Sequence, residues 1–501
     1  MANDEVAQDR RDLRRGVMVN ALGYLLKLAV PVMLVLVIRF YGKEAFGIFT
    51  FAQATLLFVV RVAMVGLDKA LLWWIPQQER GRQLAGWRAV LIAVGTLSTL
   101  IALAIAIVGA PVMAQMGDTP EAEGPLRVMA FALVPMALLE LLVASTMGLK
   151  RMEPNVLVKE TVLPIAMVGT ALLLVPLGWG AMGLAVAMNV AYVIACGVAW
   201  VWWRKLFRGV RDPLPTSPLP PQRMLRYAIP MWMSEMSNSF LQRVDTYAVA
   251  YLTDLETLGV YAAVTQIANT IRSIRRSFDP IVLVIAAEIG AAGAEERLRQ
   301  GFSYATFLVT ATQLPVLAFI LAFAQWLMPL FGEGFDQGTN AVMILCAFWV
   351  INSAVSLAGI VISAYGYSTL TFVNVLLAIL IQGAVLWVLV PPYGLEGAAF
   401  GVGIGYTILG LIQLVQMRWL TGSWNLTALV AWPMVFGLAG ACAAAVAWVG
   451  VPDPGLLVWR VVVFVAFVVV YGAGMGWMWR RRKAFEPKPA PSPPIPGARA
   501  T

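Results

Sequence analysis

The amino-acid sequence predicts an all-α polytopic membrane protein with fourteen transmembrane helices. Hydrophobic residues make up 60% of its 501 positions and charged residues only 13%, whereas soluble domains are about half apolar and about a quarter charged. A bilayer core about 30 Å thick requires about 20 apolar residues per helix. Runs of this kind predict spans at 17–40, 45–74, 87–110, 127–147, 156–176, 180–203, 227–252, 257–289, 302–328, 339–364, 369–390, 395–419, 426–449 and 456–479.

The distribution of basic residues supports this number of spans. Short cytoplasmic loops are enriched in lysine and arginine, and an even number of spans places the basic connections on one side, with both termini cytoplasmic. The formal net charge of +9 then follows from orientation and from contact with anionic membrane lipids, and gives no reason to expect nucleic acid as a partner. The basic connections contain Arg10, Arg11, Arg80, Arg82, Lys150, Arg151, Arg204, Lys205, Arg297, Arg299, Arg418, Arg480, Arg481, Arg482 and Lys483, and the opposite set contains Asp118, Glu121, Glu123, Asp254, Glu256, Glu333, Asp336, Glu396 and Asp453.

A weak internal repeat predicts two similar halves. The strings Glu44-Ala45-Phe46-Gly47-Ile48-Phe49 and Glu256-Thr257-Leu258-Gly259-Val260-Tyr261 share the pattern Glu-x-x-Gly-[Ile/Val]-[Phe/Tyr] and lie 212 residues apart. Repeated halves are typical of transporters, in which they build one site and move about it. Because each half has six spans, both halves begin on the same side, and we expect them to be related by an axis along the membrane normal.

A proline-rich segment divides the chain between these halves. Residues 212–221 contain five prolines, which stop helices and stiffen the connection. We predict a cytoplasmic N-terminal segment at 1–16, an N-lobe with helices 1 to 6 at 17–203, a cytoplasmic linker at 204–222, a C-lobe with helices 7 to 12 at 223–419, two further helices at 420–480 and a disordered cytoplasmic tail at 481–501.

Ionisable side chains inside the predicted spans indicate where function lies. Each costs about 2.5 to 3.5 kcal/mol at the bilayer centre on insertion scales, so we predict that they line a shared wet lumen between the halves. Four of them on the eighth span, from position 272 to 279, are spaced to lie on one helical face. The cations are Lys27, Arg61, Arg243, Arg272, Arg275 and Arg276, and the acids are Glu140, Glu235, Asp245 and Asp279.

The excess of cations in this set favours an anionic substrate. The planar fork of arginine suits phosphate oxygens, and a diphosphate headgroup is therefore the predicted ligand. The four acids are candidates for coupling to H⁺ or Na⁺, or for pairing within the lumen, in a chain that contains no histidine to relay protons. The alternative for the whole set is internal pairing, of Arg243 with Asp245 or Glu235 and of Arg276 with Asp279.

Other charged and sulfur-containing residues are given structural interpretations. Asp68 and Lys69 lie at the cytoplasmic end of the second span, where capping or interfacial anchoring explains them better than substrate contact. Lys159 also lies near a cytoplasmic end. The three cysteines fall inside apolar spans and fit neither a disulfide framework nor a zinc site, so we expect no metal, no cofactor and no catalytic residue.

Four short motifs carry a family resemblance. They are Phe40 to Phe49, Gly66-Leu67-Asp68-Lys69-Ala70, Arg243-Val244-Asp245 with Leu258-Gly259-Val260-Tyr261, and Pro392-Tyr393-Gly394-Leu395-Glu396-Gly397-Ala398-Ala399. In this order and spacing the chain resembles oligosaccharide flippases of the multidrug/oligosaccharidyl-lipid/polysaccharide exporter superfamily, such as O-antigen flippases, over about residues 10–480.

The resemblance implies a V-shaped fold of two six-helix lobes plus two C-terminal helices. It also implies a bacterial inner-membrane carrier that moves polyprenyl-diphosphate-linked glycans to the outer leaflet by alternating access, for O-antigen, capsule or exopolysaccharide assembly. Related flippases carry charged residues in a central lumen, and coupling to H⁺ or Na⁺ is implied by analogy alone. The expected partners are the lipid-linked glycan, membrane lipids and other polysaccharide assembly proteins, and the chain is expected to be a monomer.

Three other functions compete with this interpretation. A drug or organic-cation antiporter of the same fold would need carboxylates in its site, which the cationic lumen argues against. A membrane-embedded polysaccharide polymerase or ligase would need a large outer loop with clustered catalytic groups, which the sequence lacks. A scaffold without a transported substrate would not explain buried charges in both halves.

Overall fold

The computed structural model describes residues 29–78, 80–116, 120–149, 151, 153–208, 220–292, 295–365, 367–421 and 456–480, and within these ranges it contains helices and no β-strand. The first helices are α2 (Ala29–Met64), α3 (Leu67–Trp74), α4 (Arg80–Ala104), α5 (Ala110–Met116), α6 (Glu123–Ala130), α7 (Leu133–Gly148), α8 (Glu153–Leu157), α9 (Leu163–Leu174) and α10 (Gly180–Leu206). They are followed by α11 (Gln222–Leu241), α12 (Val244–Leu252), α13 (Leu255–Ala292), α14 (Glu295–Leu327), α15 (Thr339–Ala364), α16 (Ser368–Thr421) and α18 (Leu456–Arg480).

Short 3₁₀ and π segments join several of these helices. The 3₁₀ segments are η1 (Ile75–Gln77), η3 (Pro120–Ala122), η5 (Val175–Leu177), η6 (Met328–Phe331) and η7 (Phe335–Gly338). The π segments are η2 (Ile105–Gly109), between α4 and α5, and η4 (Val158–Val162), between α8 and α9. Because π segments shift the angular position of the residues after them, the faces of α5 and α9 cannot be deduced by continuing a 3.6-residue period from the preceding helix.

The all-α membrane fold predicted from the sequence is confirmed. Every predicted span except 426–449, which lies outside the described residues, falls wholly or partly on a described helix. Seven described helices are long and apolar enough to cross a membrane, or eight if the bent pair Phe335–Ser353 and Val355–Ser363 forms one span. One of the seven, Thr369–Leu420, has 52 residues, and this length is more than two bilayer crossings require.

Two long helices each contain a break at a glycine. Helix α2 is kinked at Gly42, with φ 80° and ψ 171°, and α16 is kinked at Gly394, with φ 52° and ψ −122°. The breaks fall between the predicted spans 17–40 and 45–74 and between 369–390 and 395–419. Each of these helices therefore corresponds to two of the predicted spans.

The chain divides into two compact units. The first unit contains the described residues of Met1–Thr270, Gln325–Leu345 and Val375–Gly405, and the second contains those of Ile271–Ala324, Cys346–Asn374 and Tyr406–Thr501. Helices α13, α14, α15 and α16 each contribute to both units. The lobe boundaries predicted from the sequence stay a prediction.

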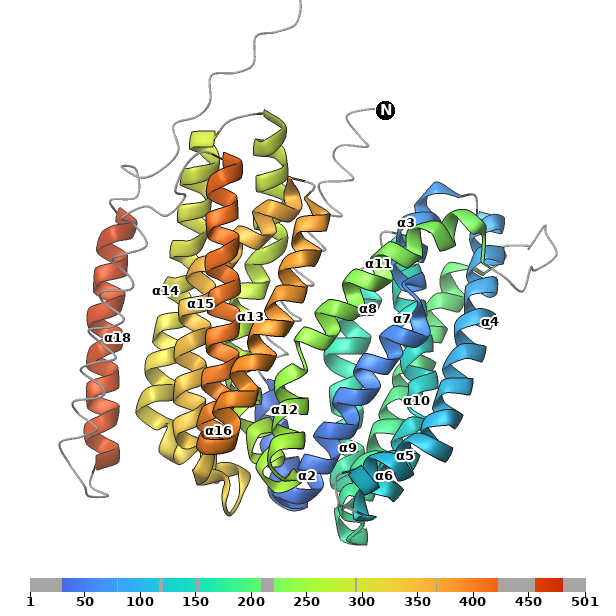
Figure 1. The fold of residues 1–501 in the computed structure, drawn as a ribbon, viewed down its shortest axis with the longest axis horizontal. Coiled ribbons are helices and arrows are strands. Elements are labelled where there is room, and N and C mark those ends of the chain that lie inside the picture. The colour runs from blue at the N-terminus through green and yellow to red at the C-terminus, as the bar shows by residue number, and fades with distance from the viewer. Residues whose placement is uncertain are drawn as a thin grey trace, which may run out of the picture. The chain divides into compact units, whose positions relative to one another are not determined.

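Helix α7 is the centre of the first unit. Helices α3, α4 and α10 pack against it, and α10 also packs against α9 (Figure 1). The α7 side chains Leu133, Leu139 and Leu141 are at most 1% exposed, and their close van der Waals packing stabilises the contacts between helices. Helix α11 packs against α2 and α3.

The second unit has its own apolar core. Phe302 and Val309 of α14, Leu357 and Val361 of α15, and Met417 of α16 form a buried cluster. The buried Tyr471 of α18 donates a hydrogen bond of 2.8 Å from its hydroxyl to the carbonyl oxygen of Ala311 in α14. An interhelical bond of this kind satisfies a hydroxyl group that would otherwise be unpaired in an apolar environment.

The two copies of the repeat meet in a reciprocal contact at their glycines. A Cβ on Gly47 would overlap the carbonyl oxygen of Leu255, and a Cβ on Gly259 would overlap the carbonyl oxygen of Lys43. Gly259 is the repeat equivalent of Gly47, and Leu255 is the repeat equivalent of Lys43, because each lies 212 residues further along the chain. A contact in which i meets j and j meets i is typical of a two-fold relation, so the start of α13 and the second half of α2 cross with approximate two-fold symmetry.

Replacing either glycine of this crossing with alanine is expected to destabilise the protein. The added methyl group has no space between the two backbones, and overpacking of this kind costs about 1–3 kcal/mol. Gly47→Ala and Gly259→Ala should each lower the midpoint of thermal aggregation of the detergent-solubilised protein, measured by size-exclusion chromatography after heating. Gly169→Ala on α9, where nothing lies within 4 Å of the added Cβ, is the matched control, and equal midpoints for all three variants would contradict the prediction.

Candidate functional site

A left-handed break between α2 and α3 folds the chain back on itself. Val65 has φ 49° and Gly66 has φ 71°, conformations that cost little for glycine and are strained for valine. A Cβ on Gly66 would meet the carbonyl oxygen of Ala228 and the backbone of Trp232, both on α11. The glycine therefore allows both the turn and the close approach of α11.

This break brings Asp68 to Arg61. Arg61 Nη1 lies 3.4 Å from Asp68 Oδ2, and Arg61 Nη2 lies 3.9 Å from Glu140 Oε1 of α7. Glu140 Oε2 accepts a hydrogen bond of 2.8 Å from Lys159 Nζ in η4. Glu140 therefore lies between two cations that come from different helices.

Helix α11 contributes a further ion pair next to Arg61, between its Glu235 and Lys69 of α3. Lys69 Nζ lies 3.5 Å from Glu235 Oε1, and Trp232 Nε1, one turn earlier on α11, donates a hydrogen bond of 3.0 Å to the carbonyl oxygen of Arg61. We call Arg61, Asp68, Lys69, Glu140, Lys159 and Glu235 the N-terminal charge cluster. Its three cations and three acids carry no net formal charge.

Arg243 and Asp245 flank the break between α11 and α12. Arg243 Nη1 donates hydrogen bonds to the carbonyl oxygen of Ser239, at 3.0 Å, and to its Oγ, at 3.4 Å. Arginine near a helix C-terminus commonly satisfies the last carbonyl groups in this way. Asp245 Oδ2 accepts a hydrogen bond of 2.9 Å from the hydroxyl of Tyr261 on α13.

Four further predicted site residues lie on one face of α13 in the second unit. Arg275 Nη1 lies 3.1 Å from Asp279 Oδ1, one turn further along the helix. The guanidinium carbon of Arg272 lies over the ring of Trp349, 4.5 Å from its centroid, and 5.3 Å from the centroid of Tyr406. We call Arg272, Arg275, Arg276 and Asp279 the α13 charge cluster, which has three cations and one acid and a net formal charge of +2.

The structure brings some of the predicted site residues together and leaves others apart. Arg61 meets Glu140, and Arg275 meets Asp279, whereas Glu235 pairs with Lys69 rather than with Arg243 as one alternative proposed. Lys27 lies outside the described residues.

The sequence placed Asp68, Lys69 and Lys159 near helix ends and did not predict the ion pairs that the structure shows for them. The motif Gly66 to Ala70 was the available signal for the first two, because a left-handed glycine breaks the helix. Lys159 belongs to a π segment, so its direction could not be derived from regular helical spacing.

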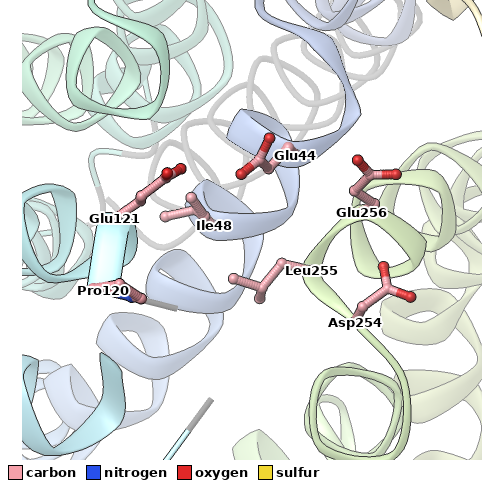
Figure 2. Close-up of a pocket in the computed structure, with 7 residues that line it drawn as sticks. All are labelled: Glu44, Ile48, Pro120, Glu121, Asp254, Leu255 and Glu256. Atoms are coloured by element: carbon pink, nitrogen blue, oxygen red, sulfur yellow. The ribbon is translucent and has the colours of Figure 1, made fainter. Parts of the chain in front are cut away.

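A pocket in the first unit has an acidic lining. Glu44, Glu121, Asp254 and Glu256 line a cavity of about 440 Å³ together with Ile48, Pro120 and Leu255, and Figure 2 shows the carboxylates of Glu44 and Glu121 facing the same space. Glu256 pairs with Lys43 at 2.7 Å. The negative charge of this lining would repel a phosphate-bearing ligand. Within the described part of the chain, no group of three or more residues is arranged to hold a metal ion.

Comparison with protein families gives one match. The model of a family described as polysaccharide biosynthesis protein matches residues 13–278, just over half of the chain. Comparison with curated proteins gives no match.

Several solved structures of membrane transporters have a similar fold. The lipid II flippase MurJ, in an inward closed conformation, aligns with a TM-score of 0.73 and 10% identity over 94% of this chain and 99% of that chain. An inward-facing multidrug resistance MATE family transporter of the MOP superfamily aligns with a TM-score of 0.65 and 16% identity, over 80% of this chain and 99% of that chain. A MOP superfamily transporter from Pyrococcus furiosus aligns with a TM-score of 0.57 and 17% identity, over 82% of this chain and 96% of that chain. At such low identities the likeness shows a shared fold and no more.

Removing the carboxylate between Arg61 and Lys159 is expected to destabilise the first unit. Glu140→Gln leaves two partly buried cations without their shared acid, which should lower the free energy of unfolding by about 1–3 kcal/mol. The measurement is the thermal midpoint of the purified protein. Glu123→Gln is the control, because its partner Arg127 is one turn away and half exposed, and a surface pair contributes about 0.5 kcal/mol or less.

The double variant Glu140→Lys with Lys159→Glu tests the ion pair between Glu140 and Lys159 by exchanging its two charges. It restores opposite charges at the two positions and should recover part of the loss seen for Glu140→Lys alone. A Glu140→Gln protein as stable as the Glu123→Gln control would show that the ion pairs around Glu140 contribute little.

Proposed function

The chain belongs to the polysaccharide biosynthesis protein family, and from this premise we propose that it translocates a polyprenyl-diphosphate-linked oligosaccharide across the bacterial inner membrane. The substrate moves from the cytoplasmic to the outer leaflet by alternating access and serves surface polysaccharide assembly. The family resemblance predicted from the sequence is confirmed, and the fold is that of multi-pass MOP superfamily transporters.

The charge of the α13 cluster carries this proposal. Counted by themselves, the three arginines and one aspartate on this helical face have a net formal charge of +2, whereas the six residues of the N-terminal charge cluster are balanced. An excess of positive charge within a membrane protein is stabilised by an anionic ligand, and a diphosphate offers oxygen atoms that match the guanidinium fork. The likeness in fold to a protein named as a lipid II flippase adds support.

An organic-cation antiporter of the same fold is the second candidate, and the acidic pocket favours it. Its four carboxylates would attract a cation. Against it, Glu256 is already paired with Lys43, and the acids of the N-terminal charge cluster each lie beside a lysine or arginine. A transported organic cation would have to displace these lysine and arginine side chains. A diphosphate can contact Arg272, which lies against aromatic rings, without displacing a carboxylate from it.

Coupling to H⁺ or Na⁺ is part of the proposal and involves the acids Glu140, Glu235, Asp245 and Asp279. Glu140 bridges two cations from separate helices, which stabilise its ionised form. It would take up a proton only in a conformation in which Arg61 and Lys159 have separated from it, so proton binding would favour that conformation.

Replacing Arg272 and Arg276 together with alanine is expected to abolish export of surface glycan. The double variant should insert into the membrane at the native level, because removing charge lowers the cost of insertion. The measurements are surface polysaccharide on intact cells and the amount of lipid-linked precursor, which should accumulate.

Arg204→Ala is the matched control, since Arg204 is exposed in the last turn of α10 and should support normal export. Normal surface polysaccharide in the double variant would count against a role for the α13 cluster in transport.

A further inference from the structure

Arg272 of the α13 charge cluster is stabilised in a different way from the cations of the N-terminal charge cluster. Arg61 and Lys159 lie against carboxylates, 3.4 Å from Asp68 and 2.8 Å from Glu140. Arg272 lies over aromatic rings instead. A carboxylate cancels the formal charge of its partner, whereas an aromatic face attracts a cation through its quadrupole and cancels none of that charge. Arg272 is therefore held in place without being neutralised by this contact.

The aromatic rings around Arg272 are fixed by their own contacts. The ring centroids of Trp349 and Tyr406 lie 5.1 Å apart, and Trp349 is only 7% exposed. Arg272 Nη2 also lies within 3.4 Å of the Tyr406 hydroxyl as a donor. Asn352 Nδ2 donates a hydrogen bond of 2.7 Å to the backbone carbonyl of Tyr406, and this fixes α16 to α15 at the level of the ring.

The backbone of α13 is held at the same level. Gln313 of α14 is fully buried, and its Nε2 donates to the carbonyl oxygen of Ile271, the residue before Arg272, at 2.9 Å. The same nitrogen donates to Ser353 Oγ of α15, also at 2.9 Å. Buried polar groups with satisfied hydrogen bonds restrict the geometry of the elements they join. Hydrogen bonds thus link α13 to α14, α14 to α15 and α15 to α16 at the level of Arg272.

We propose that Trp349 and Tyr406 are positioning residues that present Arg272 to the diphosphate of the substrate. The inference rests on the proposed function, since it assigns the anchor of that same site. A guanidinium group has its N–H donors in its own plane. The group has five N–H donors. Nη2 of Arg272 donates to the Tyr406 hydroxyl, and two of the other donors can bind two phosphate oxygens in a bidentate manner.

Arg61 is a weaker candidate for binding the diphosphate, because it already contacts two carboxylates. To bind a diphosphate, Arg61 would exchange its contacts with Asp68 and Glu140 for phosphate contacts. Both carboxylates would then lie beside the incoming anion and repel it, because like charges at short distance in a low-dielectric site are strongly unfavourable. Among the described residues Arg272 has no carboxylate to exchange on binding, so more of the phosphate contact energy is retained.

The test is a binding titration of the purified full-length protein with farnesyl diphosphate, with farnesol as the uncharged probe of the same chain. Arg272→Ala should weaken binding of farnesyl diphosphate about tenfold or more and leave farnesol binding unchanged. Trp349→Leu should weaken diphosphate binding about five- to tenfold, because the cation loses its aromatic face. Trp349→Phe retains a ring and should bind within about twofold of the native protein.

Two further variants make the test independent of folding effects. Trp387→Leu removes an exposed tryptophan that stacks on Tyr251 in the first unit, and it should bind both probes normally. Arg272→Lys keeps the charge but loses the planar group, so about fivefold weaker diphosphate binding is expected even where Trp349→Leu fails to fold.

The outcomes separate the inference from the proposed function. If Arg272→Ala binds farnesyl diphosphate like the native protein, the proposed diphosphate site on α13 is wrong. If Arg272→Ala loses affinity while Trp349→Leu does not, or Arg272→Lys keeps full affinity, the positioning role is overturned and the proposed function stands. An equal loss of farnesol and farnesyl diphosphate binding in Trp349→Leu would assign Trp349 a structural role and also overturn the inference.

Discussion

Charge compensation in an apolar environment is the constraint on which the arrangement of this protein depends. An ionised side chain inside a membrane-spanning helix loses most of its hydration, so it must find an opposite charge, a hydrogen-bonding group or an aromatic face. In the first unit Glu140 meets this requirement for two cations at once, through contacts of 3.9 Å with Arg61 and 2.8 Å with Lys159. The ion pairs join α2, α7 and η4, and thus link helices that apolar packing alone would hold less specifically.

The N-terminal charge cluster and Arg272 show two solutions to this constraint, with different chemical consequences. Pairing each cation with an acid, as the N-terminal charge cluster does, gives a neutral set that favours no ligand charge. Placing Arg272 over Trp349 and Tyr406 leaves a positive charge that a ligand can use. The first arrangement suits a structural or ion-coupled element, and the second suits the recognition of an anion.

The glycines of the repeat set how the two copies of the motif approach one another. The Gly47 and Gly259 backbones are close enough to exclude a side chain on either residue, so this crossing requires glycine at both positions. The two-fold relation at this crossing does not extend to the charged side chains. Lys43 pairs with Glu256, whereas the corresponding positions in the other copy are Leu255 and Glu44. The crossing therefore keeps a common backbone geometry while its charges differ between the two sides.

The sequence by itself determined the all-α membrane fold, the repeat and the identity of most charged residues within the spans. Apolar run length reflects the thickness of the bilayer, and buried charge is rare enough to stand out in any single sequence. Tertiary structure alone decided which charges meet. Asp68 reaches Arg61 because of the left-handed turn at Val65 and Gly66, and Lys159 reaches Glu140 from a π segment. The contact of Trp349 and Tyr406 with Arg272 joins residues 77 and 134 positions away from it, and aromatic residues are too common in membrane helices for their spacing to indicate such a contact.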